Sequence, residues 1–286
     1  MADWNISPAT VERDGAIGVF DSGVGGLTVL RAIHDRLPNE STIYIGDLAH
    51  FPYGPKPQSE VCDRAIAIAR YLEGRGVKAI VVACNTATSA AMDEIRLATT
   101  VPVVGVVEPG AEAAIQASRS KIVGVVATEG TVRSGAYGRA IMARCPEAQV
   151  TELARGDLVG MIEAGAAGSP KMWDAVATPV RELVQVHGCD TIILGCTHFP
   201  LLKAEFERAA GEGVSVLDSA TATAAAVAEV IHSDRDGPTV HEFMVTAQAS
   251  TFVRQARRLF GEQVTASVVE VATVARDATP ELAVLR

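Results

Sequence analysis

Short apolar runs rich in β-branched residues alternate along the chain with segments of helical periodicity, and this alternation limits the fold more than any other feature. Buried strands are expected at residues 17–20, 43–46, 79–83 and 101–107. Each is followed by a stretch with apolar residues three and four positions apart. Strands that alternate with helices pair in parallel, because each helix carries the chain back across the sheet. The sequence therefore predicts an α/β fold.

The same pattern begins again near residue 121. In the first half the chain runs from Asp21, just after a strand, to Cys84, at the end of a later strand. In the second half it runs over a similar distance from Thr128 to Cys196. Ligands in parallel α/β folds bind at the carboxyl ends of the strands. Two halves with facing strand ends would therefore place both cysteines across one cleft.

We accordingly predict two similar parallel-sheet α/β domains with the active site in the cleft between them. The residues after 218 add further helices and a strand, which must pack back on one half, and we assign them to the first. The predicted division is a discontinuous first domain of residues 15–109 plus 219–271, a second domain of residues 110–218, an N-terminal extension of residues 1–14 and a C-terminal tail of residues 272–286.

Composition excludes several classes of function. The 286 residues carry a formal net charge of −9 and no basic stripe, which argues against direct nucleic-acid binding. No apolar run is long enough for a membrane span, and no signal pattern precedes the first strand, so we expect a cytoplasmic protein. Five cysteines without a signal favour reduced thiols. No Cys-x-x-Cys or His-x-x-x-His pattern occurs, so no metal site is predicted.

Cys84 and Cys196 are the strongest candidates for chemistry, because each lies where a strand gives way to a polar turn and a predicted helix. The positive end of a helix dipole lowers the pKa of a thiol and favours the reactive thiolate. The alternative is that each is a small core residue, which is common for a single cysteine but less convincing for two in matched positions. Cys62, Cys145 and Cys189 have weaker contexts and are interpreted as structural.

Polar residues near these cysteines could complete a site. Asp21 opens a glycine-rich turn that lacks the dinucleotide fingerprint and a phosphate-loop lysine, so it is interpreted as an anion-holding turn. His198 is two residues from Cys196 and could exchange a proton with it. The turn at residues 52–54 could close on a ligand or simply be rigid. Asp47 could belong to the site, although such a residue is more often a helix cap.

Taken together, these segments resemble the glutamate racemase family, a branch of the aspartate/glutamate racemase superfamily. The resemblance runs from about residue 17 to residue 261. It rests on Phe-Asp-Ser-Gly-Val-Gly-Gly-Leu at 20–27, Ile-Gly-Asp at 45–47, Pro-Tyr-Gly at 52–54, Ala-Cys-Asn-Thr-Ala at 83–87, Gly-Thr-Val at 130–132 and Leu-Gly-Cys-Thr-His-Phe-Pro-Leu at 194–201.

The resemblance implies interconversion of L- and D-glutamate without a cofactor, supplying D-glutamate for peptidoglycan. Cys84 would be the base towards D-glutamate and Cys196 the base towards L-glutamate. Asp21 and His198 would assist catalysis, and Glu163 would be an auxiliary acid or base near Cys196. The implied substrate-binding residues are Asp21, Ser22, Pro52, Tyr53, Gly54, Asn85, Thr86, Thr131, Thr197 and His198. Homodimers are common in the family, and a homodimer is expected here.

Three alternatives stay open at this point. The chain could be another two-cysteine racemase of the superfamily, acting on aspartate or a hydantoin. It could be a thiol sensor that does not turn over an amino acid and forms a reversible Cys84–Cys196 disulfide. Some family members are associated with DNA gyrase, and although nothing in this sequence indicates it, such a role would require binding to the gyrase protein. Some relatives also need a cell-wall precursor as activator, for which the sequence gives no sign.

Overall fold

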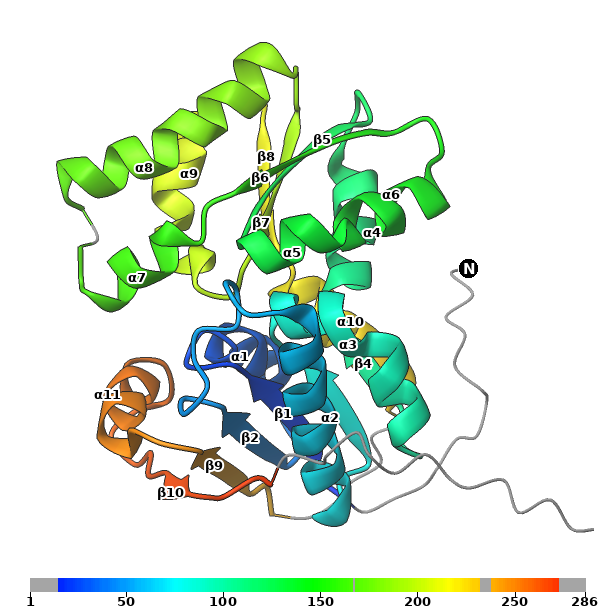
Figure 1. Ribbon diagram of the computed structural model, residues 1–286, viewed down its shortest axis with the longest axis vertical. Coiled ribbons are helices and arrows are strands. Elements are labelled where there is room, and N and C mark those ends of the chain that lie inside the picture. The colour runs from blue at the N-terminus through cyan, green and yellow to red at the C-terminus, as the bar shows by residue number, and fades with distance from the viewer. Residues whose placement is uncertain (1–14, 167, 232–237, 273–286) are drawn as a thin grey trace, which may run out of the picture.

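The computed structural model describes residues 15–166, 168–231 and 238–272. The predicted N-terminal extension and nearly all of the predicted tail lie outside these ranges. Within them the chain forms two parallel sheets, each covered by helices on both faces, and the two α/β domains are stacked end to end (Figure 1). The predicted fold class is confirmed. The exact domain boundaries stay a prediction, which limited proteolysis can test.

The first sheet has the strand order β10-β9-β2-β1-β3-β4. Helices α1, α10 and α11 cover one face, and α2 and α3 cover the other. The strands are β1 (Ile17–Asp21), β2 (Thr42–Gly46), β3 (Ala79–Val82), β4 (Val103–Gly105), β9 (His241–Val245) and β10 (Ser267–Val268). The helices are α1 (Leu27–Arg36), α2 (Gln58–Gly74), α3 (Asn85–Ala98), α10 (Ala220–Val230) and α11 (Ala249–Phe260).

The second sheet has the order β6-β5-β7-β8, with α7, α8 and α9 on one face and α4 and α6 on the other. Its strands are β5 (Ile122–Ala127), β6 (Gln149–Ala154), β7 (Thr191–Gly195) and β8 (Ser215–Asp218). Its helices are α4 (Val107–Ala117), α5 (Glu129–Ser134), α6 (Ala136–Arg144), α7 (Asp157–Glu163), α8 (Pro170–Arg181) and α9 (Lys203–Ala210), with a π-helical turn at Glu182–Val186 and a 3-10 turn at Phe199–Leu202.

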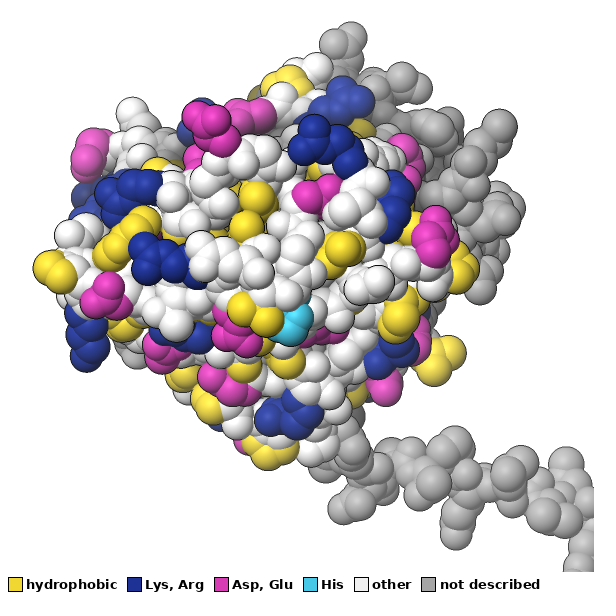
Figure 2. All heavy atoms as spheres, turned by 90° about the horizontal axis from the view of Figure 1, so that it is seen from above, with side chains coloured by type: hydrophobic (Ala, Val, Ile, Leu, Met, Phe, Trp, Pro, Cys, Tyr) yellow, Lys and Arg dark blue, Asp and Glu magenta, His cyan; other side chains and the backbone are white. Residues whose placement is uncertain are grey.

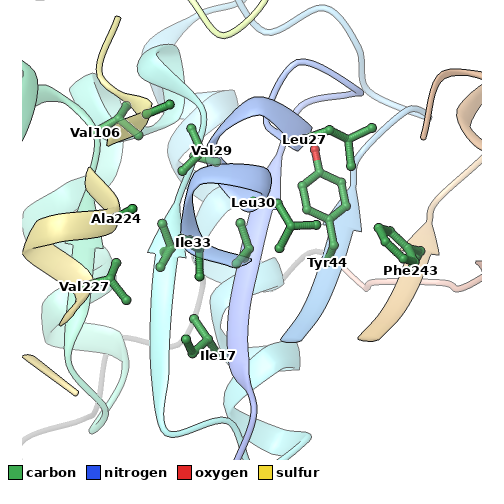
Figure 3. Packing of buried hydrophobic residues seen from close by; sticks show 14 of the residues in the cluster. Ile17, Leu27, Val29, Leu30, Ile33, Tyr44, Val106, Ala224, Val227 and Phe243 are labelled. Carbon is green, nitrogen blue, oxygen red and sulfur yellow. The ribbon is translucent and has the colours of Figure 1, made fainter. Parts of the chain in front are cut away.

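The core of the first domain follows from the periodicity of its elements. Leu30 and Ile33 lie on one face of α1 and are fully buried against the sheet. Tyr44 of β2 and Phe243 of β9 lie side by side in the same apolar cluster (Figure 3). Burial of one such side chain stabilises the folded state by roughly 1.5–3 kcal/mol. This packing holds the carboxyl ends of β1, β2 and β3 in a fixed register.

Two details differ from the expected strands. The apolar run at 101–107 is not one strand, because β4 ends at Gly105 and Val107 begins α4. Val107 is buried on the helix, and a short apolar run cannot distinguish a strand from a buried helix turn. Three edge strands, β6, β8 and β10, were not expected at all. They are short or consist of partly buried, mixed residues, which lack a clear period. None of the described helices is long and apolar enough to cross a bilayer.

Candidate active site at the junction of the two sheets

The carboxyl ends of the central strands of both sheets face each other, and polar residues from both domains meet there. The Thr197 hydroxyl, just after β7, donates a hydrogen bond to Asp21 at the end of β1 (3.3 Å). Thr86 at the start of α3 shares a hydrogen bond with Thr128, which follows β5 (2.9 Å). Parallel strands and their crossover helices thus bring together segments far apart in the sequence. The predicted facing arrangement of the two halves is what the structure contains.

Cys84 caps helix α3 and lies at the first-domain side of this junction. The Ala87 N–H donates to its sulfur (3.5 Å), and its thiol lies 3.8 Å from the Ser22 hydroxyl. Burial, and then the negative charge of Asp21, raise the pKa of the Cys84 thiol to about 12, although the Ala87 and Ser22 hydrogen bonds lower it in part. The expectation that the helix dipole makes Cys84 a thiolate is therefore wrong, because desolvation outweighs the dipole.

Cys196 lies on the second-domain side and has different neighbours. No α-helix begins there, contrary to expectation, because a short 3-10 turn (Phe199–Leu202) with Pro200 in its first turn follows instead. The imidazole of His198 supplies the positive charge. Burial alone would lower the pKa of His198, but hydrogen bonds with Cys196 and Glu163 and the charge of Asp21 raise it to about 10. At neutral pH the side chain is therefore an imidazolium, which places a positive charge beside the Cys196 sulfur.

Glu163 completes this second side. It is the last residue of α7, and its Oε1 lies 2.9 Å from Nε2 of His198. Its side chain is 27 % exposed and that of His198 is 3 % exposed, so the pair lies at the edge of the buried region. From sequence pattern alone Glu163 looks solvent-facing, and only the resemblance pointed to it. Phe51 packs beside the same imidazole, with ring centroids 5.8 Å apart.

The glycine-rich turn after β1 brings Asp21 to both sides of the site. One carboxylate oxygen accepts the Gly23 N–H (2.9 Å) and the other accepts the Thr197 hydroxyl. A side chain at Gly25 would place its Cβ 2.3 Å from the Thr197 hydroxyl oxygen and 2.7 Å from Nδ1 of His198. Glycine is therefore required at this position, because it lets the first-domain turn approach the second-domain residues closely.

Three threonine hydroxyls and one amide form the rest of the junction. Thr86, Thr128 and Thr131 are buried and lie within 2.9–3.5 Å of one another. The Asn85 amide oxygen accepts a hydrogen bond from the Tyr137 hydroxyl (2.6 Å), while its amide nitrogen is buried without a partner among the described residues. Thr128 and Tyr137 were missed from the sequence. Thr128 could have been noticed because it directly follows a predicted strand, as Asp21 does in the first half.

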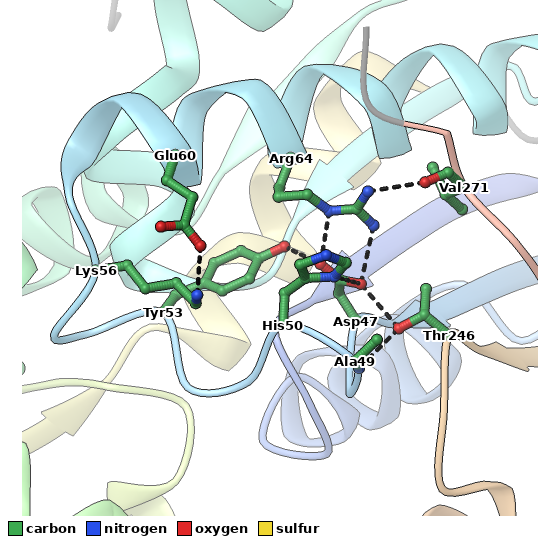
Figure 4. A network of polar contacts seen from close by, with 9 residues as sticks. All are labelled: Asp47, Ala49, His50, Tyr53, Lys56, Glu60, Arg64, Thr246 and Val271. Carbon is green, nitrogen blue, oxygen red and sulfur yellow. Dashed lines mark hydrogen bonds and ion pairs between the residues drawn. The ribbon is translucent and has the colours of Figure 1, made fainter.

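The turn at residues 52–54 is held by a buried network around Asp47 (Figure 4). The Tyr53 hydroxyl donates to Asp47 (2.6 Å), and Arg64 donates two hydrogen bonds to the same carboxylate (3.0 and 3.1 Å). Burial alone would raise the pKa of Asp47, but these hydrogen bonds hold it below its ordinary value. Asp47 caps no helix; it orders the turn. Pro52 differs from the other predicted residues because its side chain is exposed.

Arg64 connects this network to the end of the described chain. It donates a third hydrogen bond to the backbone carbonyl of Val271 (2.8 Å), and Thr246, just after β9, donates to Asp47 (2.8 Å). The C-terminal strands of the first sheet are therefore tied to the turn that carries Tyr53. No signal in the sequence pairs these positions, which are about 200 residues apart.

The remaining three cysteines lie in the core, away from the junction. Cys62, Cys145 and Cys189 are buried in the apolar clusters that line the helices. No three His, Cys, Asp or Glu side chains of residues 15–166, 168–231 and 238–272 converge as metal ligands would. On the face seen in Figure 2, basic and acidic side chains are interspersed and neither sign forms one continuous patch.

Comparison with known proteins agrees with this geometry. Residues 17–227 match the family described as Asp/Glu/Hydantoin racemase. The chain belongs to this racemase family. It is 42 % identical over 254 residues to a protein named glutamate racemase from Corynebacterium diphtheriae, covering 87 % of this chain and 95 % of that protein. As the relatives of this family are amino-acid racemases, the chain is an isomerase of that kind.

Solved structures of the family share the fold. Glutamate racemase RacE1 from Bacillus anthracis superimposes with a TM-score of 0.86 at 35 % identity, covering 91 % of this chain and 99 % of that one. The glutamate racemase of Francisella tularensis, solved in complex with D-glutamate, superimposes with a TM-score of 0.79 at 28 % identity and the same coverage. The two-domain arrangement is thus that of the racemase family.

Proposed function

We propose that this chain interconverts L- and D-glutamate without a cofactor, with Cys84 and Cys196 as the two groups that move the proton. The supporting observation is that two buried cysteines, one from each domain, lie at facing strand ends. Asp21 links the two sides, because it accepts a hydrogen bond from Thr197, which follows Cys196, and precedes Ser22, which contacts Cys84. Names of the relatives point to glutamate as the substrate. The family assignment makes racemisation the reaction class.

The mechanism needs one thiolate and one thiol, and the raised pKa of Cys84 favours it as the thiol when the reaction starts from L-glutamate. Starting from L-glutamate, the Cys196 thiolate takes the Cα proton, and the electron pair of the broken C–H bond stays on the substrate as a carbanion. The Cys84 thiol then gives its proton to the opposite face of Cα. Cys196 ends as a thiol and Cys84 as a thiolate, so the next turnover from D-glutamate runs in reverse.

The carbanion needs fixed donors, because the Cα proton is only weakly acidic. We assign that role to Asn85, Thr86, Thr197 and neighbouring backbone N–H groups, which are buried around the two cysteines. Burial strengthens each of these interactions by excluding water. Ser22, Thr131 and the turn carrying Tyr53 and Gly54 are the further residues proposed to hold the substrate. His198, which is hydrogen-bonded to Glu163, is proposed to exchange a proton with Cys196.

We further propose the biological setting that the resemblance implies. D-glutamate made by this reaction would supply peptidoglycan synthesis in the cytoplasm. A homodimer is the expected assembly, which size-exclusion chromatography with light scattering can measure. No feature of the described surface assigns a gyrase-binding role.

The direct test of this proposal is a substrate panel with a chiral readout. Purified enzyme is incubated separately with L-glutamate, D-glutamate, L-aspartate and a 5-substituted hydantoin, and both enantiomers are quantified. We expect glutamate to racemise from either side, with no added pyridoxal phosphate or metal and with a chelator present. Racemisation of aspartate or the hydantoin in preference to glutamate would overturn the substrate assignment.

A further inference from the structure

We infer that Tyr137 is a positioning residue for the proposed racemase reaction, acting from the second domain to orient the Asn85 side chain of the first domain. The inference rests on the function proposed above. Tyr137 lies on α6, far from both cysteines in the sequence, and is fully buried. Its hydroxyl donates to the Asn85 amide oxygen at 2.6 Å, so this bond crosses between the two domains.

The hydrogen bond decides which end of the Asn85 side chain is available to a ligand. An amide offers an acceptor oxygen and a donor nitrogen, and its orientation follows from its partners. Because Tyr137 occupies the oxygen, the NH2 group is left over. The Asn85 amide nitrogen is buried and has no hydrogen-bond partner among the described residues. Asn85 directly follows Cys84 in the sequence, so this nitrogen lies in the proposed site. A buried unpaired donor is costly unless a ligand accepts its hydrogen bond. A substrate carboxylate is such an acceptor.

The packing around Tyr137 holds its ring in one position. A Cβ at Gly195, the residue before Cys196, would lie 3.1 Å from the ring, and a Cβ at Gly110 of α4 would lie 3.4 Å from it. These two glycines therefore leave the space that the ring fills. The Ser219 side chain hydrogen-bonds the phenol from a third segment. Tyr137 thus packs against the strand that carries Cys196 and binds the neighbour of Cys84.

This arrangement gives the residue a role beyond stability. When Tyr137 lacks its hydroxyl, the Asn85 amide is free to turn and to present its oxygen to the substrate carboxylate, which would repel it. Substrate binding then weakens for both enantiomers, since both carry the same carboxylates. We expect Tyr137→Phe to raise KM for L- and D-glutamate by about tenfold.

A double-mutant cycle tests whether Tyr137 acts through Asn85. The kinetic constants of wild type, Tyr137→Phe, Asn85→Ala and the double variant are measured in both directions, together with thermal unfolding. We expect Tyr137→Phe to change KM little in the Asn85→Ala background, because the group it positions is gone. If Asn85→Ala does not fold, Asn85→Ser takes its place, since serine is tolerated at the start of a helix.

Tyr71→Phe is the matched control. Tyr71 lies on α2 on the surface side of the first domain, loses the same hydroxyl and should keep wild-type KM. The inference is overturned if Tyr137→Phe lowers only the unfolding temperature and leaves KM unchanged. It is also overturned if its effect on KM is the same with and without Asn85. A wild-type enzyme that racemises no glutamate would instead refute the proposed function, so the two failures are distinguishable.

Discussion

The two cysteines occupy matched positions in two similar domains, yet the charged groups around them differ. Cys84 has only hydroxyl and N–H groups as close partners and the Asp21 carboxylate nearby, so burial raises its pKa to about 12. Cys196 has the His198 imidazolium, whose pKa is raised to about 10 with Glu163 behind it. Similar backbones therefore place the thiols, and the few side chains around each one give the two sides of the site different charges.

Thiol alkylation should show the largest contrast between the two sides. With a pKa of about 12, only about one Cys84 in 10⁵ is a thiolate at pH 7. Its reaction with iodoacetamide should therefore accelerate about tenfold per pH unit between pH 7 and pH 11. Cys196 should react first at neutral pH. Peptide mapping by mass spectrometry measures both rates, and equal rates at pH 7 would remove the contrast.

Replacement of His198 should disable the Cys196 side. We expect His198→Asn to lower kcat/KM by about 10²–10⁴-fold, the usual contribution of a proton-transfer group. L- and D-glutamate have equal free energies, so kcat/KM must fall equally in both directions. Ser22→Ala is the comparison on the other side; it removes the hydroxyl 3.8 Å from the Cys84 sulfur and one proposed substrate contact, and it should cost less. A greater loss of kcat/KM in Ser22→Ala than in His198→Asn would contradict the proton-transfer role assigned to His198.

The same histidine predicts a pH dependence of stability. Its pKa in the folded protein lies above the ordinary value of 6.5, at about 10. Its contribution to stability is therefore fully present below about pH 6.5 and is lost as the pH rises through about 10. The difference in unfolding temperature between wild type and His198→Asn should shrink over that range. A difference in unfolding temperature that grows with pH would contradict a protonated His198 in the folded protein.

Asp47→Asn tests the support of the first-domain side. It leaves the buried Arg64 without its charged partner and should lower the free energy of unfolding by about 3 kcal/mol. Because the folded-state pKa of Asp47 is lowered, its contribution is present above about pH 3.8 and is lost as the pH falls further. Asp35→Asn, which breaks an exposed pair with Arg31, should cost no more than about 1 kcal/mol in urea unfolding.

Glu163→Gln should have the smallest effect. The amide keeps a hydrogen-bond acceptor near His198 but removes the negative charge, so the pKa of His198 should fall. We expect about a tenfold loss of kcat/KM and a shift of the alkaline limb of the pH–rate profile to lower pH. An unchanged profile would show that Glu163 does not tune His198.

Local patterns were sufficient to predict the parallel strands, the repeated half and the cysteines at the strand ends, because these follow from periodicity and from where polar residues interrupt it. The residues that needed the structure act through contacts distant in sequence. Tyr137 reaches Asn85 from another domain, and Arg64 joins Asp47 to Val271. The protonation of Cys84 was mispredicted for the same reason, since desolvation depends on what packs around a group and not on the helix that it caps.

The most direct test of the two-cysteine account is deuterium uptake at Cα in D2O by wild type, Cys84→Ser and Cys196→Ser, measured separately from L- and D-glutamate. Wild type should racemise with uptake, and each variant should lose racemisation. We predict that Cys84→Ser retains exchange only of L-glutamate. Cys196→Ser should retain only a slow exchange of D-glutamate, because the remaining Cys84 thiol is almost wholly protonated at neutral pH. Full racemisation by either variant, or no exchange by the wild type, would contradict the account.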